Sequence, residues 1–371
     1  MKSLIGDKKF YRRVLIIMIP IMIQNGITNF VNMLDNVMIG SVGNVEMTGV
    51  AIANQLIFVF NLCIFGAISG AGIFTAQFFG NGDQKGAMHT FRFKVIFCAM
   101  LSVIGICVFA FRGEALMRLY LSDEANAQNV ADTLALAKQY MAIMLIGLLP
   151  YAMAQCYGGT LREAGRPSIP MIAGVIAVTI NLTLNYILIF GKFGAPRLGV
   201  VGAAVATVIS RFAELLFLII YTFVKGEKCR FILDGWKSVY VPWWLIREIF
   251  KKGMPLMLNE TMWSMGIALI NQCYSLRGMD VVAANNISQT FFMVFSVAFM
   301  SVGSAIGIVL GHTLGSGNTQ DAMQTATRLI AFSVFVSAIV GAVYFVAARY
   351  IPYMYNTSSE VRYIAMRLMQ I

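Results

Sequence analysis

The chain is dominated by long apolar segments, most of which exceed the 20 or so residues that a helix needs to cross a bilayer. Only 12% of its 371 residues are charged and 58% are hydrophobic, about half the charge of a soluble domain, so a soluble fold is excluded. No segment alternates like a barrel strand, so each is predicted to be a helix. The segments lie at about 14–39, 47–79, 87–111, 134–160, 168–190, 199–224, 246–276, 281–314, 322–348 and 359–371.

The fold class predicted from these segments is an all-α polytopic membrane protein with about ten transmembrane helices. The longest polar stretch, 225–245, divides the chain into an N-lobe at 1–224, helices 1–6, and a partial C-lobe at 246–371, helices 7–10. We expect 225–245 to be a cytoplasmic linker.

The net charge of +11 is best explained by topology. With the N-terminus inside, the loops on that side hold about twice as many Lys and Arg residues as the outer loops, as the positive-inside rule requires. We therefore expect a multi-pass protein of a bacterial-type plasma (inner) membrane with a cytoplasmic N-terminus. Membrane lipid is its expected surroundings, and no nucleic-acid partner is needed to explain the charge.

An internal repeat with an offset of 235 residues is the most informative pattern. Pro20 corresponds to Pro255 and Gly43 to Gly278, and Gly80-Asn81-Gly82 corresponds to Gly315-Ser316-Gly317 without a gap. Segments 1–3 therefore correspond to segments 7–9. Because six helices separate the copies, they have the same orientation in the membrane, so the repeats are parallel, as in some secondary transporters.

Amide side chains form a stripe along one face of the first segment. Polar groups in lipid must turn inward, toward another helix or a wet cavity. Hydrogen bonds between helices would explain the amides, but the carboxylate of Asp35 beside them is costlier to bury and indicates function. The expected cavity residues on this face are Asn25, Asn29, Asn32 and Asn36.

The seventh segment repeats the stripe in register, with Glu260 at the position of Asn25, Ser264 at Asn29 and Asn271 at Asn36. A carboxylate at the depth of Glu260 is predicted to bind a proton or a cation, the alternative being a neutral Glu bonded to another helix. In the fifth segment, Asn181 and Asn185 are one turn apart. Their oxygens could complete a cation site with Asp35 or serve only in packing.

The sequence contains no Walker A motif, no His/Cys metal cluster and no Gly-x-Ser-x-Gly. An enzyme and a nucleotide-driven pump are therefore not expected, and no cofactor is predicted. A metal role is limited to Na⁺ at Asp35 or Glu260.

Four stretches, taken together and in order, resemble the MATE (multidrug and toxic compound extrusion) transporters, and the resemblance covers the whole chain. It is carried by Asp35-Asn36-Val37-Met38-Ile39-Gly40-Ser41-Val42-Gly43, by 76–80 (AQFFG), by 161–167 (LREAGRP) and by 198–207 (LGVVGAAVAT).

The resemblance implies a bundle of twelve helices in two lobes around a cavity that alternates sides. It implies export of organic cations and amphipathic drugs in exchange for Na⁺ or H⁺. Asp35 would be the N-lobe carboxylate with Asn181 and Asn185 near it, and Glu260 matches the carboxylate of the NorM-like branch. Asn185 stands where some relatives carry an acid, and the chain stops inside the tenth helix, as a fragment or a truncated protein would.

The function predicted from the sequence is a cation-coupled antiporter, a secondary active transporter rather than an enzyme. A flippase of lipid-linked precursors from the same superfamily is the nearest alternative, and a wide groove with several basic residues would favour it. A non-transporting receptor or scaffold is the alternative of a different class, and it would not need Asp35 and Glu260 on polar stripes.

Overall fold

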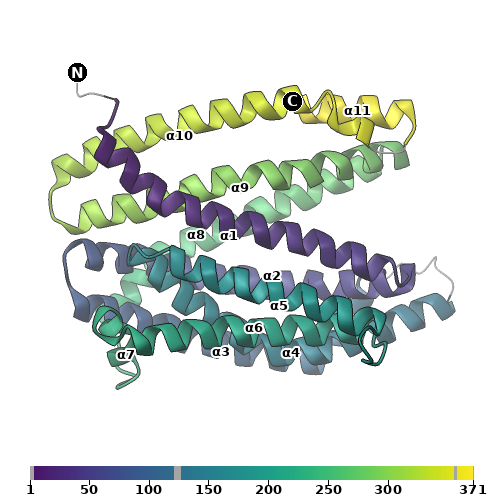
Figure 1. Cartoon of the computed structure of the whole chain (residues 1–371), viewed down its shortest axis with the longest axis horizontal. Helices are drawn as coiled ribbons and strands as arrows, with labels where there is room; N and C mark the ends of the chain where they lie inside the picture. The colour runs from purple at the N-terminus through teal and green to yellow at the C-terminus, as the bar shows by residue number, and fades with distance from the viewer. Residues whose placement is uncertain (1–3, 121–126, 355–356, 371) are drawn as a thin grey trace.

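The computed structural model describes residues 4–120, 127–354 and 357–370, and within these ranges the regular structure is helical, without strands. Figure 1 shows long, roughly parallel helices stacked into one elongated bundle. The helices are α1 (Lys8–Gly40), α2 (Asn44–Gly80), α3 (Gln84–Arg118), α4 (Ala127–Glu163), α5 (Ser168–Phe190), α6 (Val200–Val224), η1 (Gly226–Cys229), α7 (Arg230–Gly235), α8 (Trp243–Ser275), α9 (Met279–Gly315), α10 (Thr319–Ala347), η2 (Ile351–Met354) and α11 (Ser359–Gln370).

Eight of the described helices, α1–α6, α9 and α10, are long and apolar enough to cross a membrane. The predicted seventh and tenth spans are present as helices but are not among these eight. α8 has 33 residues, and α11 has only 12 residues in the described range. The prediction of an all-helical membrane protein is confirmed, with a helix count close to the expected one.

The helices form two groups that correspond to the two halves of the chain. Helices α2–α6 pack closely together, with α1 along α5, and α9 packs with α10 and α11, while α8 and α9 both also pack against α2. In Figure 1 the first group fills the lower part of the view, and α9–α11 lie above it. α1 crosses obliquely between the groups and contacts both α5 and α9.

The predicted repeat appears in the structure element by element. α1 and α8 start at Lys8 and Trp243, and the ends of α2 and α9 at Gly80 and Gly315 have the same offset of 235. The turns that follow also match. Gly82 and Gly317 take φ values of 73° and 81°, a left-handed conformation that favours glycine. The side chains of Asp83 and Asn318 then cap α3 and α10.

The two repeats meet where α2 and α9 end. A Cβ on Gly80 would collide with the carbonyl of His312, and a Cβ on Gly315 would collide with the carbonyl of Gln77. The two helix ends therefore cross at backbone contact, which only glycine allows. A second close approach joins α2 to α8, where a Cβ on Gly70 would lie 2.8 Å from the Cα of Gly253.

The segment between the halves is fixed to α3. The buried Arg92 guanidinium donates hydrogen bonds to the carbonyls of Asp234, Gly235 and Tyr240, at 2.9, 2.8 and 3.2 Å. Lys237, 2.7 Å from Asp234, holds the pKa of that half-buried carboxyl below its usual value. The 225–245 linker is thus a structured element, with α7 inside it.

Candidate functional site

The carboxylate of Asp35 on α1 lies against two amides of α5. Asn185 donates a hydrogen bond to its Oδ1 at 2.7 Å. The amide of Asn181 lies 3.2 Å from both carboxylate oxygens and, with its nitrogen turned toward them, donates to both. Both asparagines are buried, 6% and 1% exposed. The structure thus brings together the three residues that the sequence analysis proposed as one site.

Two features of this site matter for its chemistry. Within the described residues, no Lys, Arg or His forms an ion pair with Asp35 at 4.0 Å or less. The Oδ1 atom of Asn185 is buried without a hydrogen-bond partner in the same part of the chain. Buried polar atoms are nearly always paired, so an unpaired carbonyl oxygen beside an unneutralised carboxylate suits a proton or a small cation.

Thr207 completes the surroundings, although the sequence analysis did not single it out. Its hydroxyl lies 3.3 Å from the Asn181 amide and donates back to the carbonyl of Ala203. Thr207 belongs to the 198–207 stretch that carried the family resemblance. Apart from that stretch, no sequence pattern marked Thr207 as a site residue, because a single hydroxyl on an apolar helix is common.

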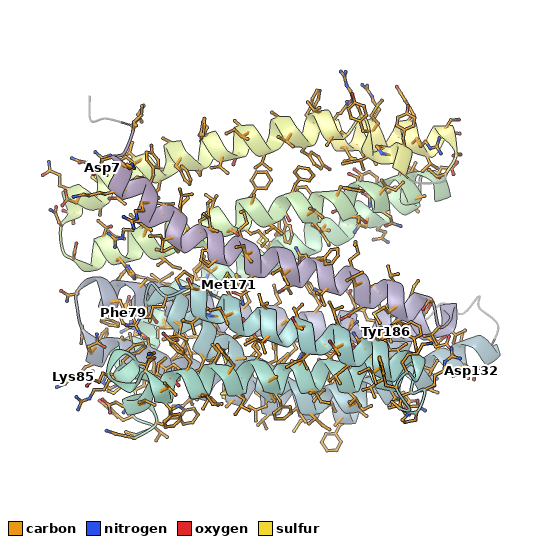
Figure 2. The ribbon with its side chains drawn as sticks, in the orientation of Figure 1. Asp7, Phe79, Lys85, Asp132, Met171 and Tyr186 are labelled. Atoms are coloured by element: carbon orange, nitrogen blue, oxygen red, sulfur yellow. The ribbon has the colours of Figure 1, made fainter. Side chains whose placement is uncertain are left out.

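The site lies far from the crossing of Gly80 and Gly315. Figure 2 shows Tyr186, the neighbour of Asn185, toward the end of the bundle that holds Asp132, whereas Asp7, Phe79 and Lys85 lie at the other end. Asp35 is correspondingly near the C-terminal end of α1, which finishes at Gly40.

The amides predicted to line a cavity along α1 have different surroundings. Asn25 is half-buried and lies 3.5 Å from the Ser301 hydroxyl of α9, so it joins the two halves. Asn29, Asn32 and Asn36 are exposed. These three side-chain amides make no hydrogen bond to another described residue, and the role of the stripe as a cavity lining stays a prediction.

The polar residues of α8 do not form a matching cluster. Glu260 is half-buried and makes no hydrogen bond or ion pair with another described residue. Ser264 has a buried hydroxyl without a partner among the described residues. Asn271 accepts a hydrogen bond from Asn285 of α9 at 3.0 Å. Glu260 and Asp35 therefore lie in separate surroundings.

A buried ion pair that the sequence analysis missed lies near the glycine crossing. The Lys94 ammonium on α3 is fully buried, binds the Glu163 carboxylate at the end of α4, and lies 3.3 Å from the Thr160 hydroxyl. His312 of α9 forms a hydrogen bond with the Glu163 carbonyl at 2.6 Å, and Arg13 lies 3.5 Å from the other ring nitrogen. This end of the bundle is thus closed by polar contacts from both halves.

A comparison with models of protein families identifies the family of the chain. The family model described as MatE matches residues 20–187 and 255–371, which is most of the chain. The chain belongs to the MatE family. The two matched blocks begin at Pro20 and Pro255, the two prolines that the repeat brings into register.

Curated relatives of this MatE protein are named as multidrug resistance proteins. It is 27% identical to the probable multidrug resistance protein NorM of Thermotoga maritima over 331 residues, which cover 88% of the chain and 68% of the relative. It is 26% identical to the multidrug resistance protein MdtK of Edwardsiella ictaluri, covering 96% of the chain and 77% of the relative.

Solved MATE structures share its fold. A MATE in the straight conformation superposes with a TM-score of 0.85 at 21% identity, covering 99% of this chain and 79% of that one. An outward-facing multidrug resistance MATE transporter gives 0.80 at 21% identity, with the same coverage. The chain is therefore a MATE-fold membrane protein, and the solved proteins with this fold include a multidrug resistance transporter.

The described part of this MatE protein has no group of three or more His, Cys, Asp or Glu side chains that could hold a metal ion. A transition-metal centre would need such a cluster. The Asp35 site instead offers one carboxylate and the unpaired Asn185 oxygen, oxygen donors of the kind that a hard cation uses.

Proposed function

We propose that this MatE protein is a cation-coupled antiporter that exports organic cations and amphipathic drugs by alternating access. The observation that supports it best is the Asp35 site. A carboxylate without a basic partner among the described residues lies on a spanning helix, next to the unpaired Asn185 oxygen. Such a group in a membrane is costly and serves ion or substrate pathways far more often than packing.

Asp35 would act through competition between a coupling cation and a positively charged substrate. A proton or Na⁺ neutralises the carboxylate, and the bound drug loses its counter-charge. A ligand shifts a two-state transporter only if it binds one state better than the other. Binding of the cation from outside would therefore favour release of the drug to the outside.

The end closed by Gly80, Gly315 and His312 is, in this proposal, the cytoplasmic one. The N-terminus and most Lys and Arg residues outside the spans belong to that end. The Asp35 site lies toward the opposite end, so in this conformation it would be reached from outside.

Glu260 is proposed as a second group that senses the coupling ion. It has no hydrogen-bond or ion-pair partner among the described residues and stands at the position that α1 fills with neutral Asn25. Packing alone would be served by an amide at lower cost, so a charge in one repeat only is better explained by an ion.

Asp35→Asn tests the proposal, because the amide keeps the size and the polarity of the side chain. We expect normal expression with drug export reduced at least tenfold, about 1.4 kcal/mol in the coupled step. Drug efflux from vesicles with and without an imposed Na⁺ or pH gradient is the measurement. Asp280→Asn, the same change at an exposed position in the first turn of α9, is the matched control. Wild-type export by Asp35→Asn would make Asp35 a structural residue.

Glu260→Gln tests the second group in the same assay. The variant should still insert and bind drug, but its efflux should lose its response to the imposed gradient. A wild-type gradient response would show that Glu260 does not sense the coupling ion, and would leave the Asp35 proposal intact.

The alternatives predict other outcomes. A receptor or scaffold would show no gradient-driven efflux in either variant or in the wild type. A flippase of lipid-linked precursors would need basic side chains around its substrate groove. The basic cavities described below lie at the N-terminal end of α1, away from the Asp35 site.

A further inference from the structure

The first two turns of α1 carry four exposed basic side chains without acidic partners. They are Lys8, Lys9, Arg12 and Arg13. Across the described residues no carboxylate forms an ion pair with any of them at 4.0 Å or less. The nearby Asp7 is occupied as the helix cap, accepting from the Phe10 amide at 2.8 Å. Four cations on one short stretch, without an ion-pair partner among the described residues, form a positive patch that attracts anions.

The four basic side chains line two adjoining cavities. One, of about 290 Å³, is lined by Lys9, Arg12 and Arg13 together with Gly165 and His312. The other is larger, about 760 Å³, and passes from basic to apolar side chains. It shares Arg12 and Ile16 with the first and is lined by Lys8, Tyr11, Arg12, Leu15, Ile16, Ile19, Pro20 and Ser168.

The basic and apolar parts follow one face of α1. Arg12, Ile16, Ile19 and Ile23 recur at helical spacing, and the three isoleucines are 53%, 42% and 40% exposed. Arg12 and Ile23 are eleven positions apart, about 16 Å at 1.5 Å per residue. That is about half of the 30 Å hydrocarbon core, the depth of one leaflet.

We infer that this groove binds an anionic glycerophospholipid. Its phosphate would lie among Lys9, Arg12 and Arg13, and an acyl chain would follow Ile16 and Ile19. Basic pockets between helices at a membrane surface recognise anionic headgroups in this way. A soluble anion would use only the basic half of the groove and would leave the apolar half empty.

The site lies on the seam between the two halves of the molecule. Ser168 begins α5, and Gly165 precedes it, whereas His312 belongs to α9. At this depth α1 also packs on α9 and α10, where Val14 and Ile17 join Ala305 and Leu329 in one core. A lipid bound there contacts both halves, so its affinity depends on how they are arranged.

The second repeat does not reproduce the cluster. The positions that correspond to Lys8, Lys9, Arg12 and Arg13 hold Trp243, Trp244, Arg247 and Glu248. The aromatic Phe250 on the same turns packs against Phe93 and Phe97 of α3. The inferred lipid site is thus specific to α1.

Native mass spectrometry of the purified, delipidated protein tests the site directly. Phosphatidylglycerol and phosphatidylcholine are added in turn, and bound lipid is counted. We expect a clear preference for phosphatidylglycerol, and a loss of about 25-fold in its affinity in Lys9→Gln/Arg12→Gln, about fivefold per removed charge. The matched control Lys85→Gln/Lys225→Gln removes two exposed charges elsewhere and should change the affinity less than twofold. Equal binding of the two lipids, or equal losses in both double variants, would overturn the inference.

A second variant separates the lipid from a free anion. Ile16→Trp/Ile19→Trp fills the apolar part of the groove and keeps every charge, so phosphatidylglycerol binding should fall at least fivefold. Glycerol 3-phosphate, the headgroup chemistry without chains, should not displace the lipid. Displacement by glycerol 3-phosphate, or unchanged binding in this variant, would show an anion site rather than a lipid site. Gel filtration and circular dichroism confirm folding, and this variant decides the matter if the charge variant does not fold.

Discussion

The two repeats agree in backbone geometry and differ in charge. α1–α3 and α8–α10 share helix starts, glycine turns and helix caps at an offset of 235 residues. At the same offset Asp35 corresponds to Ile270, and the buried Lys94 corresponds to the buried Leu329. The two repeats therefore share the way their helices cross, whereas their ionisable side chains stand at different positions.

The largest effect is expected when Lys94 is replaced by leucine, the residue that the second repeat has at the corresponding position, Leu329. Lys94→Leu leaves Glu163, whose side chain is only 12% exposed, without its ammonium partner. Removing one member of a buried ion pair costs about 3–5 kcal/mol. We expect a corresponding loss in the free energy of unfolding, measured by denaturant titration in detergent.

Two further variants test whether the unpaired charge of Glu163 causes this loss of stability. Lys94→Leu/Glu163→Gln removes both charges and should recover most of the stability. Lys85→Leu, at an exposed position of the same helix, should have little effect. If Lys94→Leu is as stable as the wild type, the ion pair is dispensable. The first repeat would then accept the leucine that the second repeat has at the same position.

The sequence predicted the helices and the repeat because their signals are local or periodic. The grouping of Asp35 with Asn181 and Asn185 depended on the family resemblance, since 150 positions separate Asp35 from Asn185. Apolar length, glycine turns and residues one turn apart, such as Asn181 and Asn185, can be read without tertiary structure. The Lys94–Glu163 pair could not be found in this way, because 69 positions separate the partners. Lys94 and Arg92 stand near the start of an apolar segment, where basic residues usually indicate a cytoplasmic loop. The structure buries both, one against Glu163 and the other against the carbonyls around α7.

The shared geometry is tested at the crossing of α2 and α9. Gly80→Leu and Gly315→Leu each place a side chain against a backbone carbonyl of the other repeat. Overpacking at a fixed contact costs about 3 kcal/mol, so the closed arrangement should become roughly a hundredfold less populated. Because the two contacts are equivalent, both variants should impair drug efflux to the same degree.

Gly307→Leu is the control for this test, because a Cβ at Gly307 meets no atom within 4 Å. The distance between spin labels on the ends of α2 and α9 would report the opening. A large effect of one glycine variant and none of the other would show that the crossing is not symmetric in function, which would contradict the comparison.

The smallest expected effects distinguish the amide networks of the two halves. Asn185→Ala removes the 2.7 Å hydrogen bond to the Asp35 carboxylate, and bonds to charged groups contribute about 1.5 kcal/mol or more. The proposed coupling ion should then be used about tenfold less effectively, seen as a shift in the Na⁺ concentration or the pH that gives half-maximal efflux. Asn285→Ala removes only a 3.0 Å bond between two neutral amides, and its partner Asn271 is exposed and can be hydrated instead. For Asn285→Ala we expect a loss of about 0.5–1 kcal/mol in the free energy of unfolding and no shift in ion dependence.

An equal shift in ion dependence in both variants would contradict the comparison. It would mean that the ion site extends into the second half, and that the two repeats are closer in chemistry than the placement of Asp35 indicates.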